Sequence, residues 1–210
     1  MEYRTSLEEA TDEIVEKKSR FIGRLVPVKT WEEAEAVLDD TRSKYKGARH
    51  YAYACILRGN NIKRFSDDGE PQGTAGAPML ELLERENLSD VIAVVTRYFG
   101  GTLLGVGGLI RAYSGSTKAA IEAARIVTME PCAEILMQMD YNMYGRAAYA
   151  LPKYETKILE ESFESEVRVR ALIRERDFDT LKNELTDVSS GTIKTEIIEK
   201  RFDFIKKLEK

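Results

Sequence analysis

The sequence predicts an α+β protein with two domains, and three observations lead to this prediction. The composition, with 43% hydrophobic and 32% charged residues, is that of an ordinary soluble globular protein. Glycine use changes sharply along the chain, since twelve of the fourteen glycines precede Thr128. After this point the apolar patterns follow the order strand, helix, strand, strand, helix, strand, which is typical of a ferredoxin-like domain. We therefore expect a first domain over residues 1–127 and a second over residues 128–210.

The first domain should begin with strands and a capped helix. Residues 12–28 alternate loosely between polar and apolar and break at residues 17–20, which predicts two strands or one bent ribbon. Thr30 and Glu33 have the spacing of a capping box, which predicts that a helix starts there. This helix should end at Gly47.

Turn residues and apolar runs predict the other elements. A hairpin is expected over residues 50–66 and a short helix over residues 79–87. Residues 90–98 form an almost continuous apolar run, which is typical of a buried central strand, and residues 109–126 should form a helix with an apolar inner face. In the second domain we expect strands over 133–141, 156–163, 166–173 and 192–202, and helices over 143–154 and 178–188.

Several classes of protein are excluded. No run approaches the ~20 apolar residues that a membrane span needs, and the first residues carry no signal pattern, so we expect a cytoplasmic protein without membrane contact. Cys55 and Cys132 have no CxxC spacing and are expected to be ordinary thiols rather than a disulfide or a metal pair. His50 is the single histidine, and no GxSxG motif occurs, which argues against hydrolytic chemistry and against a dinuclear metallopeptidase.

Basic residues are concentrated locally although the net charge is −4. Residues 41–64 contain no acidic residue and seven basic ones: Arg42, Lys44, Lys46, Arg49, Arg58, Lys63 and Arg64. On the helix predicted over residues 109–126, Arg111, Lys118 and Arg125 recur every seven residues, which places them on one stripe. Such a stripe either follows a phosphate backbone or is simply the solvated side of an amphipathic helix.

A glycine-rich segment joins the predicted central strand to this helix. Backbone amides at such a joint attract anions, but neither specific phosphate motif is present: Val106 occupies the lysine position of a P-loop, and Ile110 occupies the third glycine of GxGxxG. The glycines therefore serve either tight turns and close packing or the approach of another backbone. Arg97 adjoins Tyr98 and Phe99 at the strand end, where it could stack on a base or pair with a carboxylate.

An acidic loop lies between the hairpin and the short helix. Asp67, Asp68 and Glu70 fall within four positions, a density that could hold Mg²⁺. Their spacing is not that of an EF-hand, however, and a hydrogen-bonded loop paired with nearby Arg or Lys is the simpler interpretation.

Four segments together resemble the IMPACT/YigZ family. They are "KKSRFIG" from Lys17, "HYAYA" from His50, "FSDDGEPQGTAGAPML" from Phe65 and "VVTRYFGGTLLGVGGLIRAYS" from Val94. The resemblance implies a first domain like elongation factor G domain IV, with helices on one side of a sheet and a left-handed β-α-β crossover. It also implies a second domain like elongation factor G domain V. Eukaryotic members carry an additional N-terminal RWD domain; this sequence starts almost directly at the family domain, so that domain's partner is not expected here.

The resemblance and the charges lead us to expect a non-enzymatic, translation-associated protein that binds RNA or the ribosome through a basic face of the first domain. The candidate binding residues are Arg49, His50, Lys63, Arg64, Arg97, Tyr98, Gly100, Gly101, Gly105, Gly107, Gly108, Arg111, Lys118 and Arg125. A loop of uncertain role comprises Ser66, Asp67, Asp68, Gly69 and Glu70. We expect no catalytic residue, resident metal or cofactor; a protein partner for the second domain and the oligomeric state stay open. The alternative is an enzyme or small-ligand binder that holds an anion at the glycine loop and Mg²⁺ at the acidic loop.

Overall fold

The structure is a computed structural model that describes residues 2–59 and 61–205. It divides into two compact units, one over Tyr3–Thr128 and the other from Met129 onward together with Glu2. None of the described helices is long and apolar enough to cross a membrane.

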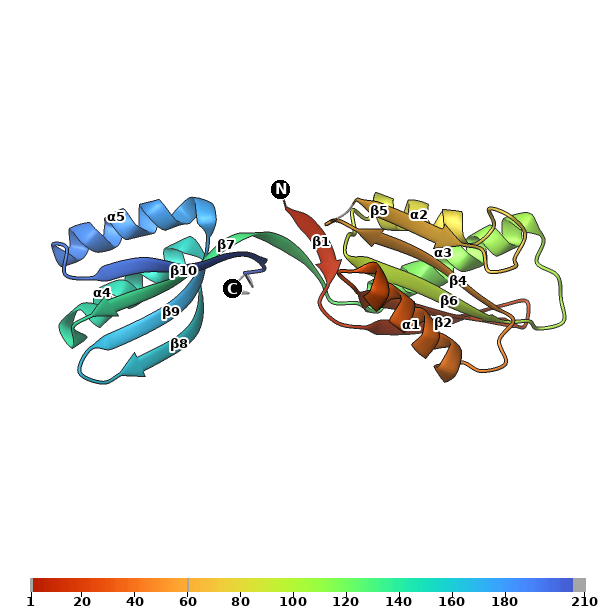
Figure 1. The fold of residues 1–210 in the computed structure, drawn as a ribbon, viewed down its shortest axis with the longest axis horizontal. Coiled ribbons are helices and arrows are strands. Elements are labelled where there is room, and N and C mark those ends of the chain that lie inside the picture. The colour runs from red at the N-terminus through yellow and green to blue at the C-terminus, as the bar shows by residue number, and fades with distance from the viewer. Residues whose placement is uncertain (1, 60, 206–210) are drawn as a thin grey trace. The chain divides into compact units, whose positions relative to one another are not determined.

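The N-terminal unit is built on a five-stranded sheet (Figure 1). Its strands, in the order β2-β3-β6-β4-β5, are β2 (Ala10–Glu16), β3 (Ser19–Pro27), β6 (Val91–Tyr98), β4 (His50–Leu57) and β5 (Ile62–Ser66). All neighbouring pairs are antiparallel, so β3 and β4 run parallel to each other with β6 between them. The connection from β3 to β4 passes through helix α1 (Trp31–Lys44). The short strand β1 (Tyr3–Ser6) pairs with β7 (Ile126–Met139).

Helix α1 begins where the sequence predicts. The Thr30 hydroxyl accepts a hydrogen bond from the Glu33 amide at 3.3 Å. The Glu33 carboxylate in turn accepts from the Lys29 amide at 2.6 Å, one residue before the N-cap. The first bond satisfies a donor that the helix start leaves without a partner, which confirms Thr30 as the N-cap; the second bond goes to the Lys29 amide and not to the Thr30 amide, so the box is formed only in part.

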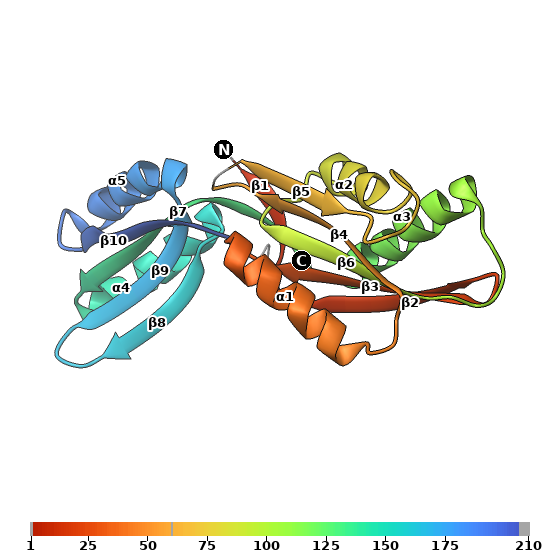
Figure 2. The same ribbon diagram turned by 45° about the vertical axis from the view of Figure 1, so that its right-hand side comes forward.

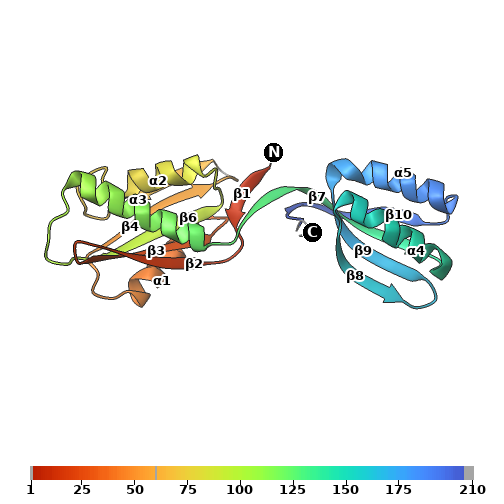
Figure 3. The same ribbon diagram turned by 180° about the vertical axis from the view of Figure 1, so that it is seen from behind.

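The resemblance led us to expect helices on one side of the sheet, and this expectation is wrong. Helix α1 packs on one face, whereas α2 (Gly76–Arg85) and α3 (Val106–Ala123) pack on the other (Figures 2 and 3). The reason lies in β6, whose residues are buried on both faces: Ile92 and Val94 belong to the α1 side, and Val91, Ala93 and Val95 to the opposite core. Because side chains alternate along a strand, a strand apolar at every position needs cover on both sides.

Helix α3 lies three residues nearer the N-terminus than predicted. It starts at Val106, because Gly105, with a φ of +73°, turns the chain and its carbonyl accepts from the Leu109 amide at 2.9 Å. It ends at Ala123, after which the backbone is extended. Arg125 therefore lies beyond the helix, and the predicted three-residue stripe is wrong in its last member.

The C-terminal unit confirms the predicted βαββαβ order. Its elements are the rest of β7, α4 (Tyr141–Ala150), η1 (Leu151–Tyr154), β8 (Lys157–Phe163), β9 (Val167–Arg174), η2 (Glu175–Asp177), α5 (Phe178–Ser189) and β10 (Lys194–Asp203). The strand order β10-β7-β9-β8 is that of an antiparallel ferredoxin-like sheet. The α+β prediction is confirmed, and the likeness to elongation factor G domains stays a prediction.

Both cysteines are buried free thiols. Burial raises the pKa of the Cys55 thiol to about 12 and that of the Cys132 thiol to about 11. Both side chains therefore stay protonated near neutral pH and behave as small apolar core residues.

Candidate functional site

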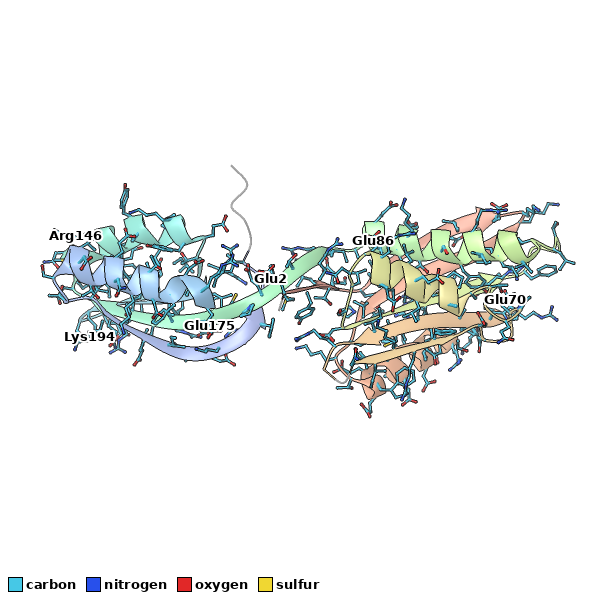
Figure 4. All side chains as sticks on the ribbon, turned by 90° about the horizontal axis from the view of Figure 1, so that it is seen from above. Glu2, Glu70, Glu86, Arg146, Glu175 and Lys194 are labelled. Carbon is cyan, nitrogen blue, oxygen red and sulfur yellow. The ribbon has the colours of Figure 1, made fainter. Side chains whose placement is uncertain are left out.

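A pocket of about 350 Å³ lies where β6 ends and α3 begins. Arg49, His50 and Arg97, together with the acidic-loop residue Glu70, supply its charged and polar lining. Glu70 is labelled in Figure 4, at this end of the N-terminal unit. Apolar residues complete the lining, among them Phe99, Leu103, Leu104, Val106 and Leu109.

Strand register brings the polar residues together. His50 lies opposite Arg97 in the β4–β6 pair, and the Arg49 amide donates to the Arg97 carbonyl at 3.3 Å. On the other side of β6, Phe21 of β3 lies opposite Arg97. The end of the central strand thus collects residues that are far apart in sequence.

Arg97 pairs with a carboxylate, and its guanidinium also lies 5.4 Å from the ring centre of Phe21 and 5.5 Å from that of Phe99. Its Nη1 atom donates to Glu70 Oε1 at 2.5 Å, and the Tyr113 hydroxyl donates to the same oxygen at 2.8 Å. Arg97 is 6% exposed, Glu70 9% and Tyr113 fully buried. Burial, and then the Glu70 charge, raise the pKa of Tyr113 well above its usual range, so its hydroxyl keeps the proton it donates.

His50 is held in one orientation beside this pair. Its Nδ1 atom lies 2.7 Å from the Asp68 carbonyl oxygen. A carbonyl only accepts, so Nδ1 carries the proton, and in the neutral ring Nε2 is an acceptor. This Nε2 atom lies 3.9 Å from Glu70 Oε1.

The acidic loop is a hydrogen-bonded structural loop. Asp67 accepts from the amides of Gly73, Ala75 and Gly76 at 2.8 to 2.9 Å. Desolvation acts to raise the pKa of Asp67, but the three amides outweigh it and hold that pKa below its usual value.

The other carboxylates of this loop have different partners. Asp68 accepts from the Tyr51 amide at 2.6 Å, and its carboxylate lies 3.9 Å from the Arg42 guanidinium. Glu70 forms the ion pair with Arg97. The Ser66 hydroxyl accepts from the Asp68 amide at 3.1 Å, and Gly69, with a φ of +84°, lies against His50. Across the described ranges, no three His, Cys, Asp or Glu side chains form a group that could hold a metal. The structure thus does not bring the three carboxylates together as Mg²⁺ ligands.

Packing and turns explain most of the loop glycines. A Cβ at Gly100 would lie 2.0 Å from the Lys18 carbonyl carbon, and one at Gly108 would lie 2.9 Å from Leu104 Cβ. Gly101 and Gly105 have φ values of +83° and +73°. Among the glycines of this joint, Gly107 is explained by neither reason. Its φ is not positive, and a Cβ there would make only an ordinary contact, 3.5 Å from the Arg111 guanidinium.

The basic stretch of residues 41–64 does not form one face. Lys63 pairs with Glu84 at 2.7 Å, Lys44 lies 3.7 Å from Glu9, and the Arg64 guanidinium lies over the Trp31 ring at 4.2 Å. On α3, Lys118 pairs with Glu122 at 3.5 Å. The structure therefore does not bring Lys63, Arg64, Lys118 and Arg125 together with the pocket.

A different set of cations comes from segments at this end of the sheet, and we call it the basic end. Its members are Lys17, Lys18, Lys46, Arg49 and Arg111, all exposed. Within the part of the chain that the structure describes, none of their side chains forms an ion pair. The exposed carboxylate Glu16 lies on the same β2–β3 turn and offsets one of these charges.

Backbone contacts hold the basic end in place. Gly100 packs on the Lys18 backbone and donates to the Ser19 hydroxyl at 3.1 Å. The Tyr98 hydroxyl donates to the Lys46 carbonyl at 3.3 Å. Sequence reasoning did not include Lys17, Lys18 and Lys46 among the site residues, although the first two belong to the hallmark segment "KKSRFIG".

Comparison with known proteins identifies the family. Residues 17–121 match the Impact N-terminal domain, and residues 137–192 match a domain of unknown function, DUF1949. The IMPACT family member YvyE of Bacillus subtilis is 34% identical over 206 residues, covering 98% of this chain and 94% of that protein. The chain belongs to the IMPACT family. The family match includes the pocket and the whole basic end.

Other family members are similar over different lengths. YigZ of Escherichia coli is 33% identical over 186 residues, covering 87% of this chain and 91% of that protein. Protein IMPACT of Oryctolagus cuniculus is 34% identical over 96 residues, 44% of this chain and 30% of that protein. A crystal structure described as that of a hypothetical protein aligns with a TM-score of 0.60 and 31% identity, covering 94% of this chain and 98% of that one.

Proposed function

We propose that this chain is a non-enzymatic, translation-associated regulator that binds RNA or the ribosome through the basic end of its N-terminal unit. Membership of the IMPACT family supports the link to regulation of translation. The observation that carries the binding proposal is that Lys17, Lys18, Lys46, Arg49 and Arg111 come from segments at one end of the sheet, are exposed, and form no ion pairs among the described residues.

Charge supports a local rather than a general affinity for nucleic acid. The net charge of −4 opposes binding by the whole surface. Exposed charges more than about 10 Å apart are largely screened at 0.1 M salt, so a phosphate at the basic end responds mainly to the cations beside it. Each phosphate contact also releases counterions, which supplies most of the affinity.

Aromatic side chains beside these cations suit a single strand. Phe99 is 45% exposed, and Tyr98 is partly exposed on the same strand end, where the Arg20 guanidinium lies 5.5 Å from its ring centre. Bases of any sequence stack on such rings while cations follow the backbone. This combination favours single-stranded RNA over a duplex as the ligand.

Fluorescence anisotropy with a labelled single-stranded RNA at low salt tests the proposal. The double variant Lys18→Glu/Arg49→Glu should bind at least about tenfold more weakly than the native chain, since two phosphate contacts become repulsions. The matched control is Lys29→Glu/Arg85→Glu, which makes the same charge change at two exposed cations away from the basic end. Equal weakening by both variants, or no binding by the native chain, would overturn the proposal.

A further inference from the structure

The N-terminus of α3 is open toward the pocket. The Leu109 amide bonds back to Gly105, so the amides of Val106, Gly107 and Gly108 precede the first intrahelical bond, and no side chain caps them. Gly105 and Val106 line the pocket. Such amides, with the helix dipole, form a favourable position for an anion.

A buried arginine in the same pocket is incompletely satisfied. Arg97 lines the pocket, more than nine-tenths of its side chain is buried, and its Nε atom has no hydrogen-bond partner among the described residues. The guanidinium has five N–H donors, and among the described residues it forms one hydrogen bond, from Nη1 to Glu70. A buried donor left open in this way indicates a ligand or water at the site.

Acceptors lie beside these donors. Both hydrogen bonds to Glu70 reach its Oε1 atom, and no described residue donates to Oε2. His50 adds its Nε2 atom as an acceptor, because the Asp68 carbonyl holds the proton of the neutral ring on Nδ1. The pocket therefore offers acceptors for hydroxyl or amino groups as well as donors for an anion.

The pocket also has an apolar rim. Phe99, Leu103 and Val106 are 45%, 81% and 60% exposed, and a group of exposed apolar side chains is characteristic of a ligand-binding groove. They line the pocket beside Arg49. A ligand that covers this rim must carry a flat or apolar group next to its charged one.

We propose that the pocket binds one nucleotide as a nucleoside monophosphate. The phosphate lies at the N-terminus of α3 beside Arg49, the base stacks on Phe99, and hydroxyl or amino groups donate to Glu70 and His50. The Glu70 charge does not repel the phosphate strongly, because the Arg97 guanidinium compensates it and the Tyr113 hydroxyl donates to the same carboxylate oxygen. This inference goes beyond the proposed function, since a free nucleotide suffices and no long strand is needed.

Amide chemical shifts of the full-length chain test this directly, with the four nucleoside 5′-monophosphates, the four nucleosides and inorganic phosphate as probes. At least one monophosphate should shift the amides of residues 105–108 saturably. Its nucleoside should bind at least about tenfold more weakly, because it lacks the phosphate. A 5′-phosphorylated RNA oligomer that competes with it would identify the strand end as a second source of the same group.

Val106 provides a matched pair of variants. It is exposed in the first helical turn, so both Val106→Glu and Val106→Gln should fold. Val106→Glu should weaken the monophosphate at least about tenfold through repulsion, whereas Val106→Gln, of the same shape, should retain binding. Equal effects of the two variants, a response to inorganic phosphate alone, equal affinity for nucleosides, or no shift with any probe would overturn the inference.

Discussion

Glu70 is the residue on which the candidate site depends most. The sequence predicted that its loop pairs with basic residues, and the structure confirms this in the contact between Glu70 and Arg97. The identity of this partner could not be predicted from the sequence. Arg97 lies 27 residues from Glu70, and the pairing of β4 with β6 is what brings the two residues to the same end of the sheet. Nor did the pattern indicate that Tyr113 would share the same oxygen.

Glu70→Ala should destabilise the N-terminal unit by about 3 kcal/mol, because removal of one partner leaves a buried guanidinium without its counter-charge. Urea titration measures this, with fluorescence of Trp31 as the reporter. This residue is the single tryptophan of the chain and lies in the N-terminal unit.

The matched control is Glu84→Ala. Glu84 pairs with Lys63 at 2.7 Å, but both side chains are exposed. Loss of such a surface pair should cost less than about 1 kcal/mol. If the two variants lose the same stability, Glu70 is not a buried structural partner of Arg97.

At the scale of elements, the glycine-rich joint between β6 and α3 has two functions. Gly100 permits contact with the β2–β3 turn, and Gly105 turns the chain into α3. The sequence offered both close packing and ligand approach as explanations, and packing is confirmed at Gly100 and Gly108. The close neighbours could not be predicted, because Lys18 is 82 positions away from Gly100 in sequence.

Gly100→Ala should therefore destabilise the N-terminal unit by about 1–3 kcal/mol or more, since the backbone of Lys18 must move. Gly107→Ala in the same joint is the control. It has room for a Cβ and lies in a helical turn, so it should be neutral or stabilising by up to about 1 kcal/mol. The same Trp31 titration separates the two, and equal losses would contradict the packing explanation.

Element positions were predictable where the pattern is local. The capping box fixed the start of α1, and the continuous apolar run identified β6 as central. The limits of α3 were wrong because the first turn, residues 106–108, contains two glycines and no apolar periodicity. The placement of α1 on its own face depends on tertiary packing, which the pattern of one helix does not contain.

At the scale of the whole molecule, the order of elements in both units was predictable but the basic end was not. Its cations come from the β2–β3 turn, the α1–β4 connection and α3, which only the strand order brings to one end of a sheet. Counting charges along the chain instead favoured residues 41–64, many of which are ion-paired or spread over other surfaces.

The salt dependence of RNA binding tests the central claim most directly. With up to five cations on a single strand, a plot of log association constant against log salt concentration should have a slope of about −2 to −3.5. For Lys18→Glu/Arg49→Glu the slope should be shallower by about 1.5, whereas Lys29→Glu/Arg85→Glu should leave it unchanged. A slope near zero for the native chain, or the same slope for both variants, would contradict binding through the basic end.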